Sequence, residues 1–120
     1  MPSVVGEVRD VDEELLALLD DEYARTILVA TREESRSAQA LSELCDADDS
    51  TIYRRIERLQ DRDLLDAHQQ LDPNGNHYKT YSARLERVEI EFHDDGVTID
   101  VDRREPAADR FTRLYEEFTG

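Results

Sequence analysis

Four arginines within nine residues are the side chains best placed to do chemistry in this chain of 120 residues. They lie in the segment STIYRRIERLQDR (residues 50–62), which also carries hydroxyl groups at its start. A guanidinium group can donate two hydrogen bonds to the edge of a guanine, and hydroxyl groups suit phosphate oxygens or base edges. The candidate DNA-binding residues of this segment are Ser50, Thr51, Tyr53, Arg54, Arg55, Arg58 and Arg62.

The same segment is predicted to be a helix. Ile52, Ile56 and Leu59 recur at i, i+4 and i+7, a spacing that places apolar side chains on one helical face. Asp48 precedes them and can cap the free N–H groups of the first turn. We expect the arginines to lie on the opposite face. There they could contact DNA or, alternatively, pair with acidic residues of the same solvated surface.

A second short helix is predicted immediately upstream. Ser37 is its expected cap, and Leu41 and Leu44 lie on its apolar face. A tight turn over residues 45–48 joins it to the arginine-bearing helix. Two helices joined in this way, with the second one basic and exposed, form the arrangement called a helix-turn-helix.

A β-hairpin is predicted directly after these helices. Apolar and polar residues alternate from Leu65 to Leu71, and a second strand-like run covers residues 77–83. Between them, DPNGN (residues 72–76) has the composition of a tight turn. The residues at the tip and flank that could touch phosphate or the minor groove are Asn74, Asn76, His77 and Lys79.

The stretch LSELCDADDSTIYRRIERLQDRDLL, followed by DPNGNHYKTYSA, resembles the winged helix-turn-helix of ArsR-like and TrmB-like transcriptional regulators. The resemblance covers about residues 20–83 and implies an α+β fold with a three-helix core and a β-hairpin wing. It also implies a sequence-specific regulator that binds double-stranded DNA. The recognition helix, about residues 49–62, would enter the major groove, and the wing, about residues 65–83, would contact the backbone or minor groove. Where such regulators carry glycine before the wing, this chain has Asp63, a residue type that tolerates the left-handed conformation.

The other segments complete an expected division into three parts. Residues 1–10 show no periodicity and are expected to be a flexible arm. Residues 11–83 are expected to form the DNA-binding domain, whose first core helix spans about residues 22–31. Residues 84–120 are expected to add a second hairpin, apolar on one face and acidic on the other, and a last helix.

The last helix carries the residues of an expected homodimer interface. Its apolar positions recur at i, i+3, i+4 and i+7, and they are Phe111, Leu114, Tyr115 and Phe118. An exposed aromatic stripe typically marks an interface, and a two-fold symmetric protein can meet two half-sites on DNA. The alternative is that this helix closes the core of its own subunit.

The net charge of −15 is unusual for a protein expected to bind DNA. Residues 50–84 nevertheless hold six basic and five acidic side chains, so this segment is nearly neutral whereas the segments on either side of it are acidic. Fourteen of the 15 basic residues are arginine. Such an acidic, lysine-poor composition resembles that of proteins from halophilic archaea, whose molar salt screens the repulsion between surface carboxylates.

No motif for catalysis, a cofactor or a metal is present, because the sequence has no Gly-rich phosphate loop, nucleophile elbow or paired Cys/His spacing. We therefore expect a protein that is not an enzyme and uses no cofactor. The single cysteine, together with the lack of a long apolar run or leader-like start, indicates a cytoplasmic protein without a membrane span. Two alternative functions remain open: a winged-helix module that contacts proteins of a transcription complex, and a redox-responsive regulator that uses Cys45.

Overall fold

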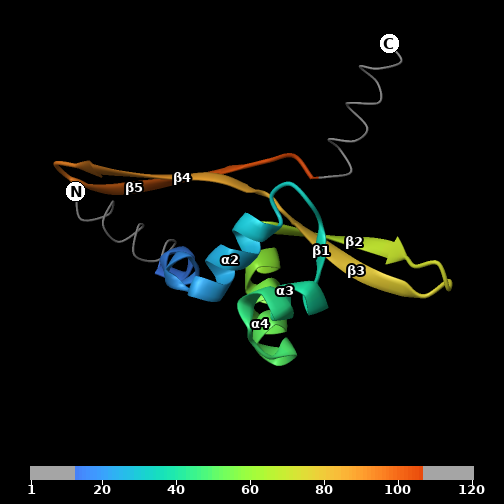
Figure 1. The fold of residues 1–120 in the computed structure, drawn as a ribbon. Helices are drawn as coiled ribbons and strands as arrows, with labels where there is room; N and C mark the ends of the chain where they lie inside the picture. The colour runs from blue at the N-terminus through green and yellow to red at the C-terminus, as the bar shows by residue number, and fades with distance from the viewer. Residues whose placement is uncertain (1–12, 107–120) are drawn as a thin grey trace, which may run out of the picture.

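The computed structural model describes residues 13–106 as a mixed α+β fold (Figure 1). Residues 13–20 are helical. The other elements, in chain order, are α2 (Glu22–Ala30), β1 (Arg36–Ser37), α3 (Ala38–Cys45), α4 (Asp49–Asp61), β2 (Leu65–Leu71), β3 (His77–Ala83), β4 (Leu85–His93) and β5 (Gly96–Arg103). The expected arm and the expected interface residues Phe111, Leu114, Tyr115 and Phe118 lie outside the described residues. Within the described range, no helix is long and apolar enough to cross a membrane.

Side-chain caps fix where the three central helices begin. The carboxylate of Asp21 accepts a hydrogen bond of 2.8 Å from the backbone N–H of Ala24. Ser37 and Asp48 accept equivalent bonds of 3.1 and 3.0 Å from the N–H groups three residues further on. These bonds satisfy N–H groups that have no partner within the first helical turn. The caps predicted for α3 and α4 are therefore confirmed.

The helices and the first hairpin enclose one apolar core. Ile52, Ile56 and Leu59 of α4 are at most 1% exposed, as their spacing predicted. Ile27 of α2 and Leu41 of α3 belong to the same cluster and are fully buried. Burying a side chain of this size is worth about 1.5–3 kcal/mol, so these apolar rows dominate the packing of the three helices.

Strands β2 and β3 form the hairpin that was predicted for residues 65–83. The register runs from Leu65 opposite Ala83 to Leu71 opposite His77. A short third strand, β1, pairs with the other edge of β3 and gives the sheet order β1-β3-β2. Only two residues long, β1 is too short for any alternating pattern to predict it.

Left-handed residues hold the two turns that flank β2. Asp63, between α4 and β2, has a φ of +58°, so aspartate adopts the conformation that glycine would otherwise supply. Gly75, in the hairpin turn, has a φ of +85°. In the same turn, the carboxylate of Asp72 accepts two backbone N–H groups at 2.9 and 2.8 Å. Such an aspartate-based turn stabilises the tip without any contact from elsewhere in the chain.

Strands β4 and β5 form the predicted second hairpin, which extends away from the helices (Figure 1). The cross-strand pairs on one face are all apolar: Val88–Val101, Ile90–Ile99 and Phe92–Val97. Polar residues, most of them acidic, occupy the other face, because successive side chains of a strand alternate between faces. The outer part of the apolar face is open, with Ile90 43% and Phe92 81% exposed.

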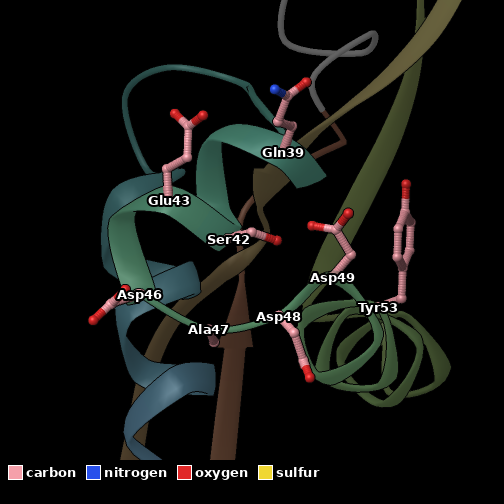
Figure 2. Close-up of a pocket in the computed structure, with 8 residues that line it drawn as sticks. All are labelled: Gln39, Ser42, Glu43, Asp46, Ala47, Asp48, Asp49 and Tyr53. Carbon is pink, nitrogen blue, oxygen red and sulfur yellow. The ribbon is translucent and has the colours of Figure 1, made fainter.

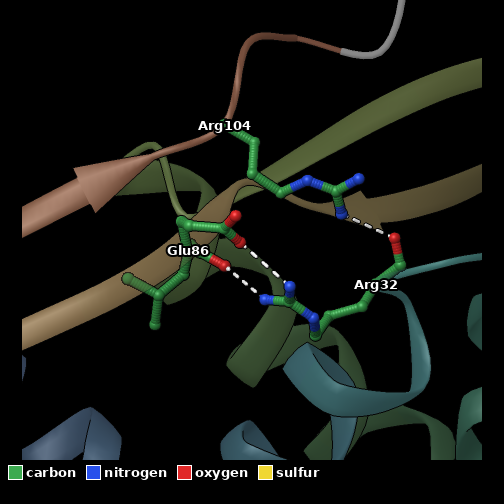
Figure 3. A network of polar contacts seen from close by, with 4 residues as sticks. Arg32, Glu86 and Arg104 are labelled. Carbon is green, nitrogen blue, oxygen red and sulfur yellow. Dashed lines mark hydrogen bonds and ion pairs between the residues drawn. The ribbon is translucent and has the colours of Figure 1, made fainter.

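Arginines fasten this hairpin to the helices (Figure 3). Arg32 forms an ion pair of 2.9 Å with Glu86, and Arg104 donates a hydrogen bond of 2.6 Å to the carbonyl oxygen of Arg32. Arg103 donates at 2.8 Å to the carbonyl oxygen of Arg62, at the end of α4. These arginines therefore anchor the hairpin at two points, next to α2 and next to α4.

Candidate nucleic-acid interface

Residues 46–48 join α3 to α4 in a tight turn. Asp46 is left-handed, with a φ of +52°. This conformation lets the N–H of Ala47 bond back to the carbonyl oxygen of Ser42 at 3.1 Å, which closes α3. Asp48 then caps α4. The angle between the two helices is thus set by local hydrogen bonds as well as by the core.

The outer face of α4 presents several of the predicted DNA-binding residues. Ser50, Tyr53 and Arg54 are exposed, and the exposed fraction of Tyr53 is 49%. Thr51 and Arg58 are half-buried. Arg54 and Arg58 are four residues apart, so their guanidinium groups leave the helix on the same side. All five side chains are therefore at least partly accessible to solvent.

Arg55 does not lie on this outer face, and the expectation that it would is wrong. It follows Ile52 by three residues and precedes Leu59 by four, so it borders the apolar face of α4. Its Nε donates to the Asp21 carboxylate at 2.9 Å, and its guanidinium carbon lies 5.8 Å from the centre of the Tyr23 ring. Arg55 therefore joins α4 to α2.

The contact with Arg55 shifts the pKa of the Asp21 carboxyl group. Burial raises the pKa of its carboxyl group, but the hydrogen bonds from Arg55 and from the Ala24 N–H lower it by more. The resulting pKa lies below the ordinary value, so the ion pair persists at neutral pH.

Arg62 is also removed from the outer face. It is the C-cap residue of α4, and its side chain is only 25% exposed. Its guanidinium group lies 3.9 Å from the Glu14 carboxylate, and its backbone carbonyl accepts the bond from Arg103. Arg62 thus connects α4 to the first helical segment and to β5.

The predicted hairpin residues Asn74, Asn76, His77 and Lys79 are all exposed. Lys79 also lines a groove between the hairpin and α4, together with Tyr53 and Gln60. Tyr78 lines the same groove and is 45% exposed, although the sequence analysis did not single it out. The sequence did carry a signal for Tyr78, because this residue is adjacent to the only lysine of the chain and lies in a candidate DNA-binding hairpin.

Tyr81 belongs to the same groove but is 4% exposed. Burial, with a further contribution from nearby Tyr53, raises the pKa of its hydroxyl group. The phenol therefore stays protonated at neutral pH. The groove combines a lysine and aromatic rings, which suit a sugar-phosphate backbone, with two acidic side chains, Glu57 and Asp72, which do not.

The start of α4 has the opposite electrostatic character. A hollow between α3 and α4 is lined by Gln39, Ser42, Glu43, Asp46, Ala47, Asp48, Asp49 and Tyr53, four of them acidic and none basic (Figure 2). Ser50 and the N–H of Thr51 both bond to the Asp48 carboxylate, at 3.4 and 3.0 Å. Hydrogen bonds from the side chain and backbone of Thr51 lower the pKa of Asp48. A bare phosphate would meet negative charge here.

Cys45 is half-buried at the end of α3. Burial raises the pKa of its thiol, and the nearby Asp21 and Glu22 carboxylates raise it further. A thiol in such surroundings forms little thiolate, the reactive species, at neutral pH. Within residues 13–106, no group of three or more His, Cys, Asp or Glu side chains is placed to hold a metal ion.

When compared with models of known protein families and with curated protein sequences, the chain matches none of them.

Proposed function

We propose that this protein is a transcriptional regulator that binds double-stranded DNA through a winged helix-turn-helix. In this proposal α3 and α4 are the helix-turn-helix, α4 is the recognition helix, and the β2–β3 hairpin is the wing. The observation that carries the proposal is the outer face of α4. This face presents Arg54 and Arg58 one helical turn apart. The groove between the helix and the hairpin adds Lys79 and tyrosine rings, beside the acidic Glu57 and Asp72.

The proposed contacts follow from the exposed side chains. Arg54 and Arg58 read base edges in the major groove, since arginine paired with guanine is the commonest specific contact. Tyr53, Tyr78 and Lys79 hold the backbone along the groove, and Asn74, Asn76 and His77 reach phosphate or the minor groove from the hairpin tip. Arg55 and Arg62 leave the set of proposed contacts, because their side chains are engaged within the fold.

A titration of labelled promoter fragments in about 2 M KCl, where the charge repulsion is screened, tests the proposal. We expect the double variant Arg54→Ala/Arg58→Ala to lose about 2–6 kcal/mol of binding free energy, because a good base contact is worth about 1–3 kcal/mol. Arg87→Ala is the matched control, since Arg87 is an exposed arginine of β4 and lies outside the proposed interface. Equal affinity for the double variant and the control would refute the role of α4.

We also propose that the protein acts as a homodimer through the apolar face of the β4–β5 hairpin. A two-stranded hairpin is marginal alone, and Phe92 at its outer end is 81% exposed. The same apolar face of a second copy would cover these exposed side chains. A two-fold symmetric dimer would also offer two recognition helices to two half-sites on DNA.

One observation favours a second candidate function, a module that binds protein. The hollow at the start of α4 is acidic, which suits a basic peptide better than DNA. Failure of the wild type to bind any DNA fragment at any salt concentration would favour this function.

A further inference from the structure

Ser42 carries a buried hydroxyl group without a hydrogen-bond partner among the described residues. The residue is 7% exposed, and its Oγ is inaccessible to solvent in the fold. A serine hydroxyl within a helix commonly donates to the carbonyl four residues earlier, but this one does not. Buried polar groups of this kind are rare in folded proteins, and a bound water or ion is one way to satisfy them.

The hydroxyl points into the acidic hollow described above. Figure 2 shows Ser42 Oγ directed from α3 towards the start of α4, and the Asp49 carboxylate directed back towards α3. Glu43 and Asp46 point outward from the rim, and Asp48 caps α4. The hollow has no basic side chain in its lining, so the species it attracts is a cation.

We propose that the hollow binds a hydrated divalent cation of the Mg²⁺ class, with the Asp49 carboxylate as its direct protein ligand and Ser42 Oγ as a second ligand once this shielded hydroxyl turns into the hollow. Oxygen ligands alone select hard cations. The described residues do not bring three acidic, His or Cys side chains together, so the protein supplies only part of the coordination shell. Mg²⁺ suits such a site, because it keeps several waters and is often held by one or two carboxylates together with a phosphate.

In the complex with DNA, a phosphate completes the shell, and this part of the inference rests on the proposed function. The cation then lies between the carboxylates at the start of α4 and the DNA backbone. It turns a surface that repels phosphate into one that binds it. The same arrangement explains how an acidic N-terminal end of α4 can coexist with an arginine-bearing outer face.

The cation site is tested on the free protein with Mn²⁺ as a paramagnetic probe. Amide resonances of the full chain are recorded in about 0.5 M and about 2 M KCl, which separates a bound divalent ion from a screened ionic atmosphere. We expect selective broadening around residues 42–50 at both salt concentrations, reversed by excess Mg²⁺. We expect the broadening to disappear in Asp49→Asn and to weaken in Ser42→Ala. Glu33→Gln, which changes an exposed carboxylate outside the hollow, is the control and should keep it.

The same spectra report folding, so loss of the site is distinguished from loss of structure. Broadening spread evenly over the acidic surface, broadening retained in Asp49→Asn, or broadening abolished by the higher KCl concentration would each overturn the cation site. None of these outcomes depends on DNA, so failure of DNA binding leaves this test intact. For a protein that does bind DNA, Mg²⁺ should tighten binding several-fold in the wild type and not in Asp49→Asn. An equal Mg²⁺ effect in both would overturn the bridging role.

Discussion

Replacing Arg55 with methionine should destabilise the protein and leave its affinity for DNA nearly unchanged. Methionine keeps the unbranched apolar stem but removes the charge that meets Asp21 at 2.9 Å. Arg54, the neighbouring residue in the chain, should show the reverse pattern, because its side chain is exposed on the outer face of α4. The two adjacent arginines thus separate the stabilisation of the fold from the proposed binding of DNA.

The magnitude follows from the burial of the pair. The side chains of Arg55 and Asp21 are 22% and 21% exposed, between a surface ion pair and a fully buried one. Surface pairs contribute about 0–1 kcal/mol and hydrogen bonds to charged groups about 1.5–3 kcal/mol, so we expect Arg55→Met to cost about 1–2 kcal/mol. Asp21→Asn is the partner variant, because asparagine caps a helix about as well as aspartate and so keeps the bond from Ala24.

A double-variant cycle in urea, at a constant KCl concentration, measures the coupling between the two side chains. We expect the double variant to lose less unfolding free energy than the two single variants lose in sum. The difference, about 1 kcal/mol or more, is the coupling energy of the ion pair. Additive single effects would refute the ion pair. A loss of DNA affinity in Arg55→Met as large as that in Arg54→Ala, with unchanged stability, would refute the assignment of Arg55 to the fold.

Three further predictions concern acid, salt and assembly. Because the pKa of Asp21 lies below its ordinary value of 3.8, its carboxylate stabilises the folded state above that value. This contribution should be lost as the pH falls through the folded pKa, so the stability gap between wild type and Asp21→Asn should shrink below about pH 5; a gap independent of pH would contradict this. Affinity for DNA should change little, or even rise, as KCl increases above about 1 M, because cation uptake by the acidic flanks offsets counterion release. A steep conventional loss in a salt titration would contradict that expectation. Phe92→Asp should convert a dimer to a monomer in light scattering, whereas Thr98→Asp on the opposite face of the hairpin should not; dimers from both variants would exclude this face.

The sequence by itself determined the elements and most of their boundaries. Ile52, Ile56 and Leu59 predicted the buried face of α4, and the DPNGN turn predicted the β2–β3 hairpin. These features depend on interactions between residues at most a few positions apart, such as a cap, a turn or the repeat of one helical face. The same local chemistry allows Asp63 to adopt the left-handed conformation in the turn before β2.

Only the tertiary structure decided which of the basic side chains are available for binding. Arg55 contacts a carboxylate 34 positions away, and Arg32 contacts Glu86 across 54 positions. The tyrosine-lined groove and the acidic hollow likewise exist only where separate elements meet. A side chain's distant partners are set by how apolar faces pack, and no local periodicity in the sequence carries that information.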